Sequence, residues 1–217
     1  MIPMNRTYVM LTMTALGCIL SACGSQNDAE RERGDTAASA EEPSPAAEGR
    51  PNAFDRILRL QDVTFHVTSP NSGSMNLVTI TPSGLERDNS PITAEVDGSV
   101  TGAEVADLNA DGSPEIYVYV TSAGSGSYGS LAAYGANNKK SLSMIYLPEI
   151  AENSAVSQGY MGHDQFAVVE HNLVRRFPVY RQGDTNANPT GGTRQVHYRL
   201  TQGEASWVLA LDSVVEY

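Results

Sequence analysis

Apolar and polar residues alternate in short stretches throughout residues 53–217. Val63, Phe65 and Val67 alternate with threonine and histidine, and residues 115–121 alternate isoleucine and valine with tyrosine and other polar residues. A period of two places successive side chains on opposite faces of an extended chain. Both segments are therefore predicted to be half-buried β-strands.

Further strand-like segments recur between turn residues, at positions 77–80, 92–96, 141–146, 165–170, 195–200 and 207–215. A long amphipathic helix is not apparent, and one short helical turn is expected at residues 148–153. No internal repeat occurs, which argues against a propeller or solenoid. The pattern predicts an all-β protein, namely an antiparallel β-sandwich of two packed sheets with about eight to ten short strands in a single globular domain.

The first 22 residues have the composition of a signal peptide. One positive charge, Arg6, precedes an apolar run from residue 8 to residue 20, which is too short to span a bilayer. The run ends in Leu-Ser-Ala-Cys23, which resembles the lipobox of bacterial lipoproteins and implies that Cys23 carries the lipid. Because Gly24 follows the cysteine, the resemblance favours the outer membrane over the inner one. An ordinary secretory signal is the alternative.

Residues 23–52 are predicted to be a disordered tether, and residues 53–217 the folded domain. The tether is rich in Ala, Glu, Ser, Pro and Gly and has almost no large apolar residue, so it cannot bury enough surface to fold. The two cysteines of the chain are Cys18, within the predicted signal peptide, and Cys23. The domain must therefore be stabilised without an internal disulfide.

The segment Ser-Ala-Gly-Ser-Gly-Ser-Tyr-Gly, residues 122–129, follows the predicted strand 115–121. It contains a G-x-G-x-x-G pattern, but residues 130–140 run into glycine and paired asparagines, so the helix of a phosphate-binding motif is not expected. The spacing of a nucleophile elbow is absent, and so are the partner motifs of a kinase loop. Two interpretations stay open: a binding loop that presents Ser125 and Tyr128, or a hairpin turn without a role.

Residues 107–115 begin with the D-x-N-x-D-G pattern of calcium loops. An EF-hand would require glutamate at the twelfth position, where this chain has Val118. Asp107, Asn109, Asp111 and Glu115 can instead converge on one ion in a β-hairpin loop, which defines the alternative function of a calcium-dependent binding lipoprotein. The competing interpretation is a tight turn in which these side chains bond to their own backbone.

No catalytic constellation can be assembled from the remaining residues. His66 and His197 fall on the polar phase of predicted strands, and neither an H-E-x-x-H nor a defined Ser-His-Asp spacing occurs. The pair Arg175–Arg176 is an isolated basic patch in an acidic chain, so it is expected to pair with carboxylates rather than bind nucleic acid. The protein is predicted to be no enzyme and to need no cofactor.

Several blocks taken together carry a family resemblance. They are residues 100–120, 124–129, 159–164, 173–180 and 189–192. In this order they resemble the periplasmic inhibitors of invertebrate-type (i-type) lysozymes, over nearly the whole predicted domain. The resemblance implies an antiparallel β-sandwich, often dimeric, whose Ser-Gly-x-Tyr loop enters the active-site cleft of the lysozyme. By position, the loop residues are Ser125, Gly126, Ser127 and Tyr128.

The implied partner is an i-type lysozyme, and the implied role is protection of peptidoglycan against host enzymes from a lipid-anchored position in the periplasm. The formal net charge of −11 at pH 7 would attract basic lysozymes, although acidity also promotes solubility. A homodimer contact is conceivable at Tyr117 and Tyr119, on the outer face of their predicted strand. The alternative is that another part of the same chain covers these two rings.

Overall fold

The computed structural model describes residues 52–217. The predicted signal peptide, Cys23 and all of the predicted tether except Asn52 lie outside the described residues. No helix in the described part is long and apolar enough to cross a membrane.

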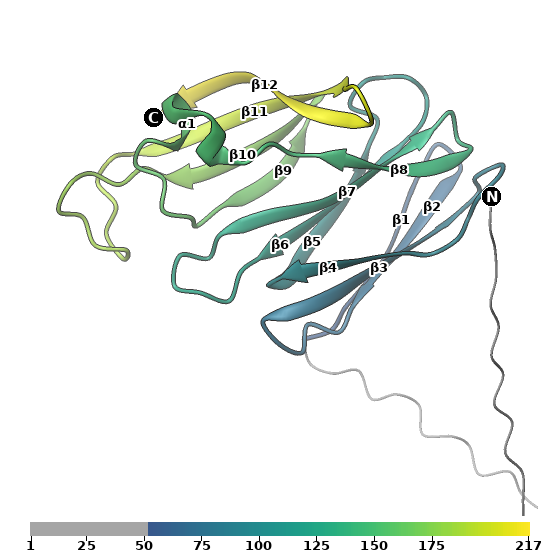
Figure 1. Cartoon of the computed structure of the whole chain (residues 1–217), viewed down its shortest axis with the longest axis horizontal. Coiled ribbons are helices and arrows are strands. Elements are labelled where there is room, and N and C mark those ends of the chain that lie inside the picture. Colours follow the sequence, from purple (N-terminus) through teal and green to yellow (C-terminus); the bar gives the residue numbers. More distant parts are fainter. Residues whose placement is uncertain (1–51) are drawn as a thin grey trace, which may run out of the picture. The chain divides into compact units, whose positions relative to one another are not determined.

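The regular secondary structure of the described part is almost entirely β-strand (Figure 1). The strands are β1 (Phe54–Leu60), β2 (Val63–Ser69), β3 (Met75–Ser83), β4 (Ile92–Asp97), β5 (Ser99–Ala106), β6 (Glu115–Thr121), β7 (Gly129–Asn137), β8 (Ser141–Tyr146), β9 (Gln165–Val169), β10 (Asn172–Pro178), β11 (Thr193–Gln202) and β12 (Trp207–Glu216). A 3-10 turn, η1 (Ile150–Glu152), and one helical turn, α1 (Ser154–Ser157), separate β8 from β9. The expected short helical turn at residues 148–153 is therefore confirmed.

The strands form two sheets, with orders β1-β2-β3-β4 and β5-β6-β7-β8-β12-β11-β10-β9. The all-β prediction is confirmed, with more strands than expected. One pairing departs from the predicted antiparallel arrangement, because β12 runs parallel to β8. The reason is topological: the chain leaves β8 through η1 and α1, crosses to the far edge at β9, and returns strand by strand until β12 meets β8.

Strand β6 is buried on both faces, so the prediction that it is half-buried was wrong. Ile116, Val118 and Val120 pack in an aliphatic core against residues of the four-stranded sheet. Tyr117 and Tyr119 pack on the opposite face, in a second core shared with β10, β11 and β12. The alternation along β6 thus separates an aliphatic environment from an aromatic one, and not core from solvent. Because Tyr117 is 0% and Tyr119 is 8% exposed, the same chain covers both rings and they make no dimer contact.

The two edge strands of the eight-stranded sheet are joined through one carboxylate. Glu104 of β5 accepts a hydrogen bond from the backbone N–H of Val168 in β9, at 2.7 Å, and another from the hydroxyl of Tyr119. The ring of Phe166, also in β9, stacks on Tyr119 with centroids 5.7 Å apart. These contacts hold β9, and with it the segment that leads into β9, close to the loop between β6 and β7.

Candidate functional site

Residues 122–128 form the hairpin loop that connects β6 to β7. At its base, Ser122 N–H donates to Tyr128 O at 2.9 Å, and Tyr128 N–H donates to Ser122 Oγ at 3.0 Å. At its tip, Ser127 N–H donates to Gly124 O at 2.9 Å and closes a four-residue turn. The predicted binding residues therefore lie together on one closed loop, which we call the Ser–Tyr loop.

Two neighbouring segments hold the backbone carbonyls of the Ser–Tyr loop. His163 N–H donates to Gly126 O at 2.6 Å, and Asn186 Nδ2 donates to Ser125 O at 2.6 Å. Gly162 has φ +92°, and a Cβ at this position would lie 2.1 Å from Gly126 O. Only glycine permits this approach. The loop is thus fixed in shape from outside.

The side chains at the tip remain available. Ser125 is exposed and Tyr128 is 48% exposed, and neither hydroxyl has a hydrogen-bond partner among residues 52–217. The Tyr128 ring packs edge-on against Tyr160, with centroids 5.7 Å apart. A Cβ on Gly126 would lie only 2.4 Å from the Tyr128 ring, so the glycine allows the ring to fold back over the loop. The arrangement presents two hydroxyl donors on a supported backbone.

A buried ion pair fixes the end of the loop at Gly129. Asp164 accepts from Arg175 Nε at 2.6 Å and from Gly129 N–H at 2.7 Å. Arg175 Nη2 donates to Gly129 O at 3.2 Å and to the hydroxyl of Tyr160 at 2.7 Å, and that hydroxyl donates to Asp164 at 2.6 Å. The side chains of Arg175 and Asp164 are 6% and 0% exposed. Asp164, Arg175, Tyr160 and the backbone of Gly129 therefore supply one another with the hydrogen bonds that water would provide at the surface.

Charge and burial act in opposite directions on these groups. Burial alone would lower the pKa of Arg175, because it disfavours the charged guanidinium. The hydrogen bond to Asp164 and the negative charge of Asp164 outweigh this effect, so the pKa of Arg175 is raised. Burial also raises the pKa of Tyr160, which stays protonated and able to donate. Beside this network lies a cavity of about 480 Å³, whose lining includes Tyr128, Ile150, Tyr160 and Arg175.

The sequence identified the tip of the site but missed its support. Asp164 and Arg175 bond to Gly129 from 35 and 46 residues further along the chain, and Tyr160 lies four residues before Asp164. The available signal was that residues 159–164 and 173–180 carried the family resemblance without an assigned role. The expectation that the basic patch pairs with carboxylates is confirmed for Arg175. Arg176 is exposed and donates to the side-chain oxygen of Gln195 instead.

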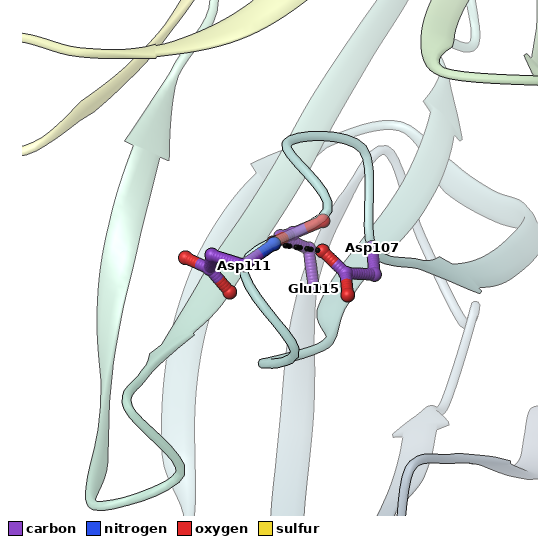
Figure 2. Close-up of side chains that lie close together, drawn as sticks. All are labelled: Asp107, Asp111 and Glu115. Atoms are coloured by element: carbon purple, nitrogen blue, oxygen red, sulfur yellow. Dashed lines mark hydrogen bonds between the residues drawn. The ribbon is translucent and has the colours of Figure 1, made fainter.

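The acidic loop at residues 107–115 is organised as a turn. Asp107 accepts from the backbone N–H of Asp111 at 3.0 Å (Figure 2) and from that of Gly112 at 2.9 Å. Asn109 Oδ1 accepts from Asp111 N–H at 3.2 Å, and Asp111 Oδ1 accepts from Ser113 N–H at 2.8 Å. The side chains thus pair with their own backbone, as in the turn interpretation.

The same loop brings oxygens of Asp107, Asp111 and Glu115 within 4.8 Å of one another, a separation that could suit a cation. Figure 2 shows the Asp111 carboxylate directed away from Asp107. Asn109 Nδ2 donates to the Asp111 carboxylate at 2.9 Å. Since every one of these side chains already caps the loop, nothing in the geometry favours the calcium interpretation over the turn.

Glu115 is the buried member of this loop, with an exposed fraction of 2%. It accepts from Leu108 N–H at 2.9 Å and from the Tyr117 hydroxyl at 3.4 Å. Burial raises the pKa of Glu115 to about 8, against the opposing effect of the Leu108 hydrogen bond and with a further contribution from the nearby acidic side chains. The carboxyl is therefore held as a neutral acid over much of the physiological range.

The histidines do not contact the serines of the Ser–Tyr loop. His66 pairs with Asp55 at 2.8 Å on the outer face of the four-stranded sheet, and His197 lies 2.7 Å from Gln195. Within residues 52–217, no histidine hydrogen-bonds to Ser125 or Ser127. A hydrolase mechanism on these serines thus has no histidine hydrogen-bonded to them as general base in the described part.

Together these features define an all-β protein with a supported, exposed loop suited to binding. A family described as the periplasmic lysozyme inhibitor of I-type lysozyme matches residues 83–174. The match confirms the resemblance to these inhibitors over residues 83–174. A search of curated proteins and a search of solved structures each found no match.

The matched segment contains the Ser–Tyr loop, Tyr160 and Asp164, and it ends one residue before Arg175. The resemblance at residues 175–180 and 189–192 lies beyond it. The family is one of periplasmic inhibitor proteins, which supports an i-type lysozyme as partner, the periplasm as compartment and a role without catalysis.

The buried ion pair gives the first prediction. Asp164→Asn should lower the free energy of unfolding by about 3–5 kcal/mol, because it leaves the Arg175 guanidinium buried without a counter-charge. Urea denaturation measures the change. Asp62→Asn is the matched control, because Asp62 forms an ion pair with Arg59 in which the two side chains are 90% and 67% exposed, respectively. That variant should lose less than about 1 kcal/mol. Equal losses in the two variants would contradict the structural importance of the buried pair.

The second prediction concerns pH. Between pH 4.5 and about 8, folded Glu115 retains a proton that the unfolded chain has released, so stability falls as pH rises through this window. Glu115→Gln keeps an oxygen that accepts from Leu108 N–H and removes the titration. We expect the wild type to lose roughly 3–5 kcal/mol more than this variant between pH 4.5 and 8.5 in urea denaturation. Parallel pH profiles for the two proteins would refute it.

Proposed function

We propose that the protein inhibits i-type lysozyme by inserting the Ser–Tyr loop into the active-site cleft. The observation that carries this proposal is the combination of a backbone fixed by the rest of the domain with free hydroxyls on Ser125 and Tyr128. A loop already held in one conformation loses little entropy on binding, which favours affinity.

The chemistry of the target supports the choice of these residues. A retaining glycosidase presents two carboxyl groups about 5 Å apart. Hydroxyl groups of Ser125 and Tyr128 can donate to such groups, and hydrogen bonds to charged acceptors contribute about 1.5–3 kcal/mol each. The half-exposed ring of Tyr128 adds apolar contact with few rotatable bonds. The loop contains no glycosidic bond, so the enzyme is occupied and cannot cleave it.

Charge contributes to the rate of association. The formal net charge of −11 attracts a basic enzyme at long range, and this attraction weakens as salt screens it. Association should therefore slow at high ionic strength more than dissociation accelerates.

The anchored location is also part of the proposal. Lipid attachment at Cys23, with residues 24–52 as a tether of roughly 30 Å root-mean-square reach, would hold the domain at the outer membrane, next to the peptidoglycan it protects. Cell fractionation that recovers the protein in the soluble periplasm, and not with the outer membrane, would refute the anchor without affecting the inhibitory function.

The third prediction tests the hydroxyls directly. The double variant Ser125→Ala, Tyr128→Ala should lose inhibition of an i-type lysozyme by at least about 100-fold in a lysis assay, because both proposed donors and the Tyr128 ring are removed. Its free energy of unfolding should fall by only about 1 kcal/mol, from the lost contact with Tyr160. Ser130→Ala is the matched control, because it removes an exposed hydroxyl from β7, directly after the loop. Full inhibition by the double variant would exclude the loop as the inhibitory element.

The fourth prediction tests loop shape with two neighbouring glycines. Gly126→Ala places a Cβ against the Tyr128 ring, whereas a Cβ on Gly124 meets nothing within 4 Å. We expect the first variant to weaken inhibition about tenfold or more by displacing Tyr128, and the second to inhibit as the wild type does. Inhibition constants measure the difference. If both variants behave alike, the position of Tyr128 does not determine inhibition.

A further inference from the structure

A second hollow lies between the turn that joins β7 to β8 and the hairpin that joins β11 to β12. Its volume is about 490 Å³, within the usual range of small-ligand sites. It is lined by Trp207 and by polar side chains that include Asn137, Asn138, Gln202 and Glu204. Strand β7 starts beside the Ser–Tyr loop and ends at Asn137 in this lining. The nine residues of the strand separate the two places by roughly 25 Å.

Trp207, the single tryptophan of the chain, forms an ordered wall of this hollow. Its indole N–H donates to Asn137 Oδ1 at 3.1 Å, and Ser143 Oγ donates to the same oxygen at 3.2 Å. A Cβ on Gly135 would lie 3.3 Å from the indole Cδ1, so the ring rests closely on the backbone of β7. The indole is only partly buried, and its orientation is set before any ligand arrives.

The remaining lining is polar and of mixed character. The side chains of Asn138, Gln202 and Glu204 have no hydrogen-bond partner among residues 52–217, so their amides and carboxylate are available. Amides donate and accept, and a carboxylate accepts. This mixture suits a ligand whose groups also both donate and accept, which is the property of a hydroxyl.

The same lining excludes other ligand classes. Pockets for apolar molecules have mainly apolar walls, whereas the walls here are mainly polar. The lining contains two carboxylates, Asp111 and Glu204, and neither lysine nor arginine, so a phosphate or an acidic sugar would be repelled. What remains is a neutral molecule with many hydroxyls and an apolar face to lie on an indole.

We propose that this hollow binds a neutral saccharide, with one pyranose ring stacked on Trp207 and its hydroxyls bonded to Gln202, Asn138 and Glu204. The site is separate from the Ser–Tyr loop, and binding here does not depend on the inhibition of lysozyme. It gives the domain a second contact, with a polysaccharide, at the end remote from the proposed enzyme contact.

The single tryptophan permits a direct test by fluorescence. The protein is titrated with two neutral trisaccharides, tri-N-acetylchitotriose and maltotriose, and with the anionic trisaccharide trigalacturonate. We expect a saturable change in Trp207 emission with at least one neutral trisaccharide, half-complete at about 1 mM or below, and no saturable change with trigalacturonate. No saturable change with either neutral sugar, or an equal response to the anionic one, would overturn the proposal.

Variants locate the site. The double variant Gln202→Ala, Glu204→Ala keeps the fluorophore and should weaken saccharide binding at least tenfold, whereas Thr201→Ala, on the same hairpin but outside the lining, should not. Ser125→Ala with Tyr128→Ala should bind the saccharide normally, which separates this site from the inhibitory one. Undiminished binding by the Gln202, Glu204 variant would place the sugar elsewhere and refute the assignment.

Discussion

The pair of Asp164 and Arg175 is the interaction on which the site depends. Two charges that are almost fully removed from water are stable only when each is satisfied by the other and by further hydrogen bonds. Here the additional partners are both backbone groups of Gly129 and the hydroxyl of Tyr160. The segment before β9, through Asp164, and strand β10, through Arg175, are thereby bonded to the end of the Ser–Tyr loop. The requirement to satisfy a buried charge thus fixes the end of the loop at Gly129, while His163 and Asn186 hold its tip.

Strand β6 has a matching importance for the body of the domain. It contributes aliphatic side chains to one core and tyrosines to the other, so the two cores lie on opposite faces of this one strand. The loops at its two ends differ in composition. The Glu115 end begins with a rigid acidic turn closed by its own side chains, and the Thr121 end leads into the Ser–Tyr loop. The buried strand thus gives both loops a fixed base.

The sequence was sufficient for the elements that follow a simple alternation. Strands β2, β4 and β8 lie where the pattern placed them, because each has one consistently apolar face or well-marked turns at its ends. Strands β1 and β10 were missed because charged residues interrupt the pattern, although Arg175 is buried by its ion pair. Strand β7 was missed because its buried positions are three alanines and one glycine, which carry little apolar signal.

The candidate site divides in the same way. Ser125, Gly126, Ser127 and Tyr128 were recognised because they are consecutive and resemble a family motif. Their support by Asp164, Asn186 and Gly162 depends on pairings between distant segments, and a period of two contains no information about such pairings. The burial of Glu115 could not be predicted from the acidic turn either. The sequence of residues 107–115 is the same whether the Glu115 carboxyl accepts a backbone N–H inside the protein or faces water.

The parallel contact between β8 and β12 has a consequence for cooperativity. Only Trp207 and Val208 pair with β8, so the eight-stranded sheet consists of two antiparallel meanders, β5–β8 and β9–β12, joined along a very short seam. Each meander is built from local connections, the kind of unit that opens and closes together in native-state exchange. Away from that seam, Asp164 and Arg175 bond to Gly129 of β7, and Glu104 of β5 bonds to Val168 of β9. The two meanders are therefore held together by the aromatic core that they share and by these few polar contacts, with very little backbone ladder between them.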